Sequence, residues 1–298
     1  MEPPALDKAR RRDPSAKLDA GEVTEVRSCL GSIGWLARQT RPDLAFSCSI
    51  IAQAMGAPAV SHMMMAYKLA QQAVKYKHGQ LIFRPSLELD LWTCKVAVFA
   101  DSSHANVDCE KLGEKVKSQC GYVCALVSPD FTDGKKHSLH VLEWHSGSIK
   151  RVVRSTLAAE ANGLTEGAEA ALWLRAVLGE IRGEKHDELT DTIWITDAKS
   201  LRDVLVRDAG RASDKRVRII VAALRQMLEE DGIEVVWCDT AVMLADILTK
   251  ECGSEIIDLV HDVLRTNEFS IEQPATSKVA KVRASEQRRA RKDARAQD

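Results

Sequence analysis

The stretch Val96-Ala97-Val98-Phe99-Ala100-Asp101 decides the fold class, because five apolar residues in a row end in an acid. A short apolar run of this kind predicts a buried strand. The residues Thr192-Ile193-Trp194-Ile195-Thr196 predict a second such strand, and Asp197 follows it directly. Ligand sites in open α/β sheets lie beyond the carboxyl ends of the strands, so the two aspartates are candidates for one shared site. Taken singly, each could equally be an ordinary turn or helix-cap residue.

The segments around these two strands alternate between strand and helix patterns. Further strands are expected at Leu81–Phe83, Leu89–Trp92, Gln119–Val127, Leu139–His145 and Ile233–Trp237. Helices are expected at Thr156–Ile181, Lys199–Leu205, Asp214–Glu230 and, as the last element, Val242–Thr249. The order predicts an α/β protein in which helices pack against a mixed sheet.

Glu160 is a third candidate acid, on the long helix expected from Thr156. The apolar stripe of this helix consists of Leu157, Ala161, Leu164, Ala168, Ala171, Leu172 and Leu178. At about 100° per residue, Glu160 falls at the edge of that stripe. A carboxylate turned toward a sheet needs a partner, because burying an uncompensated charge is costly, and a metal ion shared with Asp101 and Asp197 would be one. A solvated glutamate at the edge of the helix is the alternative.

Asp246 is the fourth candidate, an acid within the apolar run Met243-Leu244-Ala245-Asp246-Ile247-Leu248. Alone, it could be a solvated residue of a short helix. Together, four such acids fit a two-metal phosphodiester site, where two ions about 3.5–4 Å apart activate a water and stabilise the leaving oxygen. All-oxygen ligands favour two Mg²⁺ ions, and Mn²⁺ is expected to substitute.

Composition bounds the class of protein. The chain has 298 residues and 45% apolar residues, enough for a buried core. No apolar run approaches the length of a membrane span, and the first twenty residues lack a signal core. We therefore expect a cytoplasmic or nuclear protein that is not secreted and has no membrane partner. The net charge of −1 argues against a general nucleic-acid coat protein, although residues 278–298 carry eight Lys and Arg against three acids.

The eight cysteines suggest one alternative site. Cys120 and Cys124 could join His137, His140 and His145 in a zinc site. Structural zinc sites usually show closer Cys and His spacing, so buried thiols and surface imidazoles are the favoured interpretation.

The first part of the chain has a helical pattern from Glu22 to about Gly79, with Val26, Leu30, Ile33 and Leu36 at three- and four-residue spacing. The Arg41-Pro42-Asp43 step is expected to end one helix, and further helices are expected at Leu44–Met55 and Ser61–His78. This helical part has no catalytic cluster of its own.

Several of these segments resemble, in order, the end of the reverse transcriptase region and the ribonuclease H domain of copia-type retrotransposon Pol polyproteins. The resemblance covers roughly residues 22–265, and the ordered set is more specific than any one motif. The matching segments are Leu30–Ala37, Thr40–Phe46, Ala100–Ala105, Lys117–Tyr122, Ser155–Glu160, Ala171–Arg175, Thr196–Leu201 and Leu244–Lys250.

This resemblance implies a ribonuclease H-like fold, a five-stranded mixed sheet flanked by helices and preceded by a small helical subdomain. The implied domains are a flexible leader (1–21), a connection-like remnant of the reverse transcriptase region (22–90), the ribonuclease H domain (91–265) and a basic tail (266–298). The implied activity is divalent-metal-dependent endonucleolytic hydrolysis of the RNA strand of RNA–DNA hybrids. Asp101 would contact both metals, Glu160 and Asp197 would complete their ligands, and Asp246 would bind the second metal.

The sequence departs from the family pattern at three points. Ser103 stands where the family commonly has a second aspartate, and Ala158 replaces a frequent acid before Glu160. No Tyr-x-Asp-Asp polymerase motif occurs in the chain, so no polymerase activity is expected. The chain therefore looks like a fragment or a detached reading frame, and a separate polymerase domain is a candidate partner.

Basic residues before the catalytic helix are candidate substrate contacts. Lys150, Arg151, Arg154 and Ser155 would reach phosphates near the metals, where the helix N-terminus adds a favourable dipole. A solvated turn is the alternative reading. Lys215, Arg216 and Arg218 form a second candidate patch.

The alternative function is a catalytically inactive, transposon-derived module that binds nucleic acid or protein.

Overall fold

The computed structural model describes residues 7–85, 89–104, 118–184, 191–207 and 214–272. The start of the expected leader and most of the expected basic tail therefore lie outside the described residues.

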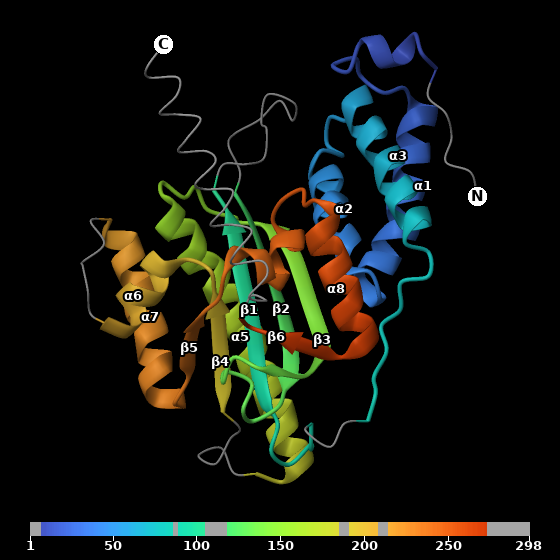
Figure 1. Cartoon of the computed structure of the whole chain (residues 1–298). Coiled ribbons are helices and arrows are strands. Elements are labelled where there is room, and N and C mark those ends of the chain that lie inside the picture. Colours follow the sequence, from blue (N-terminus) through green and yellow to red (C-terminus); the bar gives the residue numbers. More distant parts are fainter. Residues whose placement is uncertain (1–6, 86–88, 105–117, 185–190, 208–213, 273–298) are drawn as a thin grey trace, which may run out of the picture.

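A six-stranded mixed sheet forms the centre of the molecule, with the strand order β5-β4-β1-β2-β3-β6 (Figure 1). β1, β2 and β3 form an antiparallel meander, β4 runs parallel to β1, β5 runs parallel to β4, and β6 pairs antiparallel with β3. This arrangement is the ribonuclease H-like topology, which confirms the expected fold class. The strands are β1 (Lys95–Ser103), β2 (Gln119–Val127), β3 (Lys136–Ser148), β4 (Thr192–Thr196), β5 (Glu234–Trp237) and β6 (Glu268–Ser270).

The expected strands at Leu81–Phe83 and Leu89–Trp92 were wrong. The first segment is not part of the sheet. The amide of Ile82 donates instead to the carbonyl oxygen of Leu264, which lies on the last helix, α8 (Ser254–Thr266). The second is a turn held by Asp90. The sixth strand, β6, is an addition to the expected five.

Helices cover both faces of the sheet (Figure 1). α5 (Thr156–Arg182), α6 (Lys199–Arg207) and α7 (Lys215–Asp231) bury one face around Val98, Tyr122 and Trp194. The other face packs around Phe99, Val123 and Leu139 against η4 (Thr240–Val242), η5 (Leu244–Leu248) and α8 (Ser254–Thr266). No helix was expected over α8, although Ile256, Leu259, Val260 and Val263 have helical spacing.

α5 lies unusually close to the sheet. Ser155 caps its N-terminus by accepting a hydrogen bond from the amide of Ala158, and it ends at Gly183, which has a positive φ of 69°. A Cβ built at Gly163 would lie 3.0 Å from the backbone oxygen of Asp101, and one at Gly167 would lie 3.0 Å from Tyr122 and Val98. The two glycines thus let the helix approach β1 and β2, and Gly163 does so directly beside Asp101.

The N-terminal part folds as a helical unit with its own core around Val26, Leu44, Ile51 and Leu69. A capping box between Asp19 and Glu22 starts the first helix. The unit consists of η1 (Arg10–Arg12), α1 (Ala20–Gln39), η2 (Pro42–Leu44), α2 (Ala45–Gln53) and α3 (Val60–Lys75).

The helical unit contacts the sheet and α8 directly. The indole nitrogen of Trp144 on β3 donates to the carbonyl oxygen of Ala37 at 2.7 Å. Asp43 accepts two hydrogen bonds from Arg41, at 2.7 and 2.8 Å, and lies 3.5 Å from Nε2 of His261 on α8. Among the described residues, no helix is both long and apolar enough to cross a membrane.

Candidate metal centre

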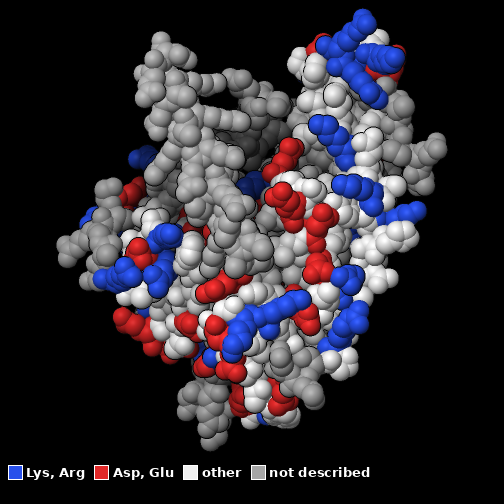
Figure 2. Space-filling view, viewed as in Figure 1, with Lys and Arg blue, Asp and Glu red and all other residues white. Residues whose placement is uncertain are grey.

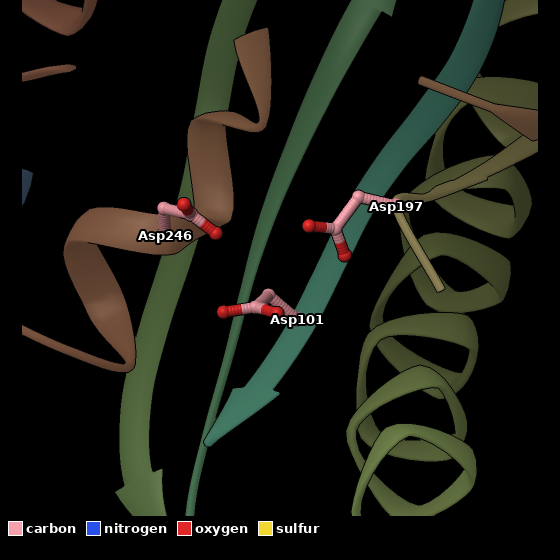
Figure 3. Close-up of side chains that lie close together, drawn as sticks. All are labelled: Asp101, Asp197 and Asp246. Carbon is pink, nitrogen blue, oxygen red and sulfur yellow. The ribbon is translucent and has the colours of Figure 1, made fainter. Parts of the chain in front are cut away.

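Three of the four predicted acids come together near the carboxyl ends of the neighbouring strands β1 and β4. Asp101, Asp197 and Asp246 each offer a carboxylate oxygen, and these oxygens all lie within 4.8 Å of one another (Figure 3). Asp101 and Asp246 are buried, and Asp197 is partly buried. Such a cluster of carboxylates could hold a metal ion.

The sheet register explains the meeting of the first two acids. Phe99 on β1 pairs with Ile195 on the parallel strand β4. Asp101 and Asp197 each follow two residues later, so the two strands deliver them side by side. Asp246 arrives from η5, which packs over β1 and β2.

Glu160 is buried on the α5 side of the same acids. Its Oε2 atom has no hydrogen-bond partner. Burial, followed by the negative charges of Asp101 and Asp197, raises the pKa of Glu160 to about 9. A buried carboxyl group that repels its neighbours and has an unsatisfied oxygen is a group that a cation would stabilise.

The pKa values of Asp246 and Asp197 are raised as well. Burial and then the charge of Asp101 raise the pKa of Asp246 to about 7. Burial is also the first cause that raises the pKa of Asp197. Each shift disfavours the charged carboxylate in the absence of a counter-ion.

Lys250 is a cation of the site that the sequence analysis did not single out. Its Nζ lies 2.9 Å from Oδ1 of Asp246 and 3.8 Å from Oδ2 of Asp101. Burial alone would lower the pKa of Lys250, but the nearby carboxylates raise it. Its position four residues after Asp246, within the Leu244–Lys250 motif, was the available signal.

Two threonines, also missed from the sequence, hold the aspartates. Thr249 Oγ1 donates a hydrogen bond to Oδ2 of Asp101. Thr240 Oγ1 donates to Oδ2 of Asp197 at 2.7 Å, and the indole nitrogen of Trp237 donates to the backbone oxygen of Asp197 at 2.9 Å. Hydrogen-bonded carboxylates of this kind are typical of oriented metal ligands.

The donor set fits a hard divalent cation. The oxygens of Asp101, Asp197 and Asp246 are all carboxylate oxygens, and Glu160 is buried beside them. Among the described residues, the ammonium group of Lys250 is paired with Asp246 and Asp101. In the part of the chain that the structure describes, no set of Cys and His ligands comes together, so nothing there favours the zinc alternative.

The predicted substrate residues lie in the segment between β3 and α5. Lys150, Arg151, Arg154 and Ser155 are all exposed. Lys150 and Arg151 line a cleft of about 340 Å³ between α5 and α7. Ser155 has a local structural role, because its hydroxyl oxygen caps α5. Lys215, Arg216 and Arg218 are exposed at the start of α7.

Comparison with known proteins gives a consistent relationship. No family model matches the chain. The retrovirus-related Pol polyprotein from transposon RE1 of Arabidopsis thaliana is 24% identical over 232 residues, 77% of this chain. The corresponding polyprotein from transposon TNT 1-94 of Nicotiana tabacum is 20% identical over 254 residues, 82% of this chain. The chain is similar to copia-type transposon Pol polyproteins. It spans 14% and 17% of the lengths of these two relatives.

Solved structures similar to this chain include ribonucleases H. RNase H1 from the archaeon Halobacterium salinarum is 20% identical, with a TM-score of 0.36, and the match covers 55% of this chain and 98% of that one. LC11-RNase H1, solved in complex with an RNA/DNA hybrid, is 15% identical, with a TM-score of 0.35, and the match covers 55% of this chain and 97% of that one.

Proposed function

We infer that this chain is a divalent-metal-dependent endonuclease that hydrolyses the RNA strand of RNA–DNA hybrids. The observation that carries the proposal is the meeting of Asp101, Asp197 and Asp246, with Glu160 buried beside them. These acids come from distant parts of the sequence, and a buried cluster of like charges has no structural benefit of its own. The topology and the transposon relatives support the same reaction class.

The four acids would hold two Mg²⁺ ions, and Mn²⁺ would substitute. Asp101 would contact both ions, Glu160 and Asp197 would complete the ligands, and Asp246 would bind the second ion. When bound, the ions activate a water for in-line attack and stabilise the leaving oxygen.

Other residues of the chain would prepare the site for this chemistry. Lys250 offsets part of the carboxylate charge through its ion pair with Asp246. Thr249 and Thr240 orient Asp101 and Asp197 through their hydroxyl groups. Preorganised ligands need no rearrangement as the phosphate arrives.

The hybrid would lie along the carboxyl ends of β1 and β4 and reach the start of α5. Lys150, Arg151, Arg154 and Ser155 are exposed there and would contact its phosphates, while the α5 N-terminus adds a favourable dipole. Figure 2 shows acidic side chains over α8, where Glu255, Asp258 and Asp262 are exposed. That face would repel a phosphate backbone, which favours the surface before α5, where Lys150, Arg151 and Arg154 are exposed.

Cleavage of a labelled RNA–DNA hybrid tests the proposal. We expect Mg²⁺- and Mn²⁺-dependent cutting of the RNA strand that stops with EDTA, and no cutting of duplex DNA. Asp197→Asn keeps the shape of the side chain but removes its charge, so it should lower the rate at least a hundredfold. Asp258→Asn, which removes an exposed acid of α8, is the matched control and should cut normally.

Retained cleavage by a folded Asp197→Asn variant would contradict the assignment of that residue. Hybrid binding without any cleavage by the wild-type chain, with either metal, would instead favour the catalytically inactive binding module.

The helical unit would be the connection-like remnant of a reverse transcriptase region, within the domain division 1–21, 22–90, 91–265 and 266–298. No polymerase activity is expected from this chain, and a separate polymerase domain would be its partner. A primed-template extension assay tests this expectation, and templated incorporation of nucleotides by the pure protein would contradict it. A hybrid substrate would place the protein in the cytoplasm or nucleus, which imaging of the tagged full chain can check.

A further inference from the structure

Thr249 lies against the acid at the centre of the proposed metal site. Thr249 is fully buried, and its hydroxyl group donates a hydrogen bond to Oδ2 of Asp101. A carboxylate can rotate about its last bond, and a fixed donor on one oxygen restricts that rotation. The hydrogen bond from Thr249 thus restrains the orientation of the Asp101 carboxylate.

A glycine on the neighbouring strand makes this contact possible. Gly121 pairs with Asp101 in the β1–β2 register. A Cβ at Gly121 would collide with Leu248 and come within 3.1 Å of Cγ2 of Thr249. Because position 121 has no side chain, the end of η5 can press onto the sheet next to Asp101.

The end of η5 is held from the other side by β3. Ser146 pairs with Gly121 in the β2–β3 register, and its Oγ donates to the carbonyl oxygen of Leu248 at 2.6 Å. Asp101, Gly121 and Ser146 therefore form one row across three strands, and Leu248 and Thr249 lie on top of that row.

The row is connected to the helical unit through Gln119. This side chain is fully buried, and its Nε2 donates to Oγ of Ser146 and to Oγ of Ser49 on α2, both at 2.9 Å. Its Oε1 accepts from Nε2 of Gln53, also on α2, at 3.2 Å. Both amide hydrogens and the amide oxygen are thus used, which gives the side chain one defined orientation.

We propose that the helical unit positions the metal centre through this α2–Asp101 hydrogen-bond chain, which runs from Ser49 through Gln119 and Ser146 to the end of η5 and Thr249. Gln119 and Thr249 are positioning residues that orient Asp101 and set the affinity of the site for its cation. The inference rests on the proposed function, since it gives these acids a metal to bind. It assigns the helical unit a structural part in the metal site.

Metal binding without substrate tests the proposal. Free Mn²⁺ is followed by electron paramagnetic resonance as it is titrated into the full chain, and the rise in melting temperature with Mg²⁺ is measured in parallel. Thr249→Val keeps the shape but removes the donor, so Mn²⁺ affinity should fall at least about tenfold, the usual effect of losing a hydrogen bond to a metal ligand. Thr249→Ser restores the donor and should restore most of the affinity.

The far end of the α2–Asp101 hydrogen-bond chain is tested at Gln119. Gln119→Leu removes the side-chain hydrogen bonds of this residue at similar volume and should weaken Mn²⁺ binding in the same direction. Ser146→Ala is a milder break of the same chain and is used if Gln119→Leu does not fold. The matched control is Thr192→Val, which removes a buried hydroxyl without a hydrogen-bond partner at the opposite end of β4.

A double-mutant cycle separates positioning from general loosening. In an Asp101→Asn background, Thr249→Val should cause little further loss of Mn²⁺ affinity, because the carboxylate that Thr249 orients for the cation is gone. The proposal is overturned if the folded Thr249→Val and Gln119→Leu variants bind Mn²⁺ like wild type, with Ser146→Ala taking the place of Gln119→Leu if the latter does not fold. It is also overturned if these variants lose no more Mn²⁺ affinity than Thr192→Val does. If Asp101→Asn itself binds Mn²⁺ normally, the proposed function fails and not this inference alone.

Discussion

At the scale of single residues, the site is defined by acids that the fold holds in an unfavourable state. Glu160 illustrates this best, since burial and the charges of Asp101 and Asp197 raise its pKa to about 9. At pH 7 the metal-free protein should therefore hold Glu160 largely protonated. A divalent cation would reverse that balance.

Glu160→Gln follows from this argument. The amide has nearly the same shape as the protonated acid, so the metal-free melting temperature should stay the same or rise at pH 7. The further rise that Mg²⁺ causes in the wild type should be reduced or lost, because the amide brings no charge to the cation. Differential scanning calorimetry with and without Mg²⁺ measures both quantities.

The pH dependence gives an independent check on Glu160. The pKa is raised above the value of 4.5 for the free side chain, so the folded state binds more protons and stability should fall as pH rises from 4.5 to about 9. In metal-free protein this contribution is at most about 1.4 kcal/mol per pH unit. Glu160→Gln should flatten the curve, and an unchanged slope in the variant would contradict the raised pKa.

At the scale of elements, the position of the site depends on the close approach of α5 to β1. A Cβ at Gly163 would lie 3.0 Å from the backbone oxygen of Asp101, which cannot rotate away as a side chain could. At Gly31 on α1, by contrast, an added Cβ meets nothing within 4 Å. The two positions separate the cost of close packing from the benefit of replacing glycine in a helix.

Gly163→Ala and Gly31→Ala should therefore shift stability in opposite directions. Overpacking at Gly163 should cost about 1–3 kcal/mol and weaken Mn²⁺ binding, because α5 also carries Glu160. Gly31→Ala should gain up to about 1 kcal/mol from helix propensity and leave metal binding alone. Urea unfolding gives the free energies, and a stabilised Gly163→Ala variant would show that the helix is not tightly seated.

At the scale of the whole molecule, Asp43 joins the helical unit to α8. Arg41 and Asp43 form a bidentate ion pair with side chains 6% and 0% exposed. Nε2 of Gln72 on α3 donates to the backbone oxygen of Asp43, and His261 of α8 faces its carboxylate. Burial would raise the pKa of Asp43, but the hydrogen bonds from Arg41 and the nearby imidazole of His261 outweigh it and lower the pKa to about 2.

This depressed pKa predicts how the whole fold responds to acid. The contribution of Asp43 to stability is fully present above its ordinary value of 3.8 and is lost as pH falls toward 2. The size of the shift corresponds to about 2 kcal/mol. Asp43→Asn should lose about 3–5 kcal/mol at pH 7, because Arg41 is left buried without its partner, and should unfold with a shallower acid dependence. Urea titrations between pH 5 and pH 2.5 compare the two slopes, and parallel slopes would count against the depressed pKa.

Local pattern was enough to predict most of the sheet and to single out the three aspartates that the structure brings together. β2 was expected at Gln119–Val127 and lies there, and β4 and α5 were placed within a few residues of their bounds. The apolar runs before Asp101 and Asp197 can be recognised from neighbouring residues alone. An apolar run of this length is buried as a strand, and the acid after it marks where the strand ends.

Only the tertiary structure decided which residues serve those acids. Thr249 and Lys250 contact Asp101 and Asp246 because η5 crosses the sheet above Gly121, and Gln119 joins them to α2 from a distant part of the chain. β6 exists for the same kind of reason, since three residues with no strand pattern become a strand by pairing with β3. Contacts between residues far apart in sequence depend on the packing of the whole chain, and no short stretch encodes them.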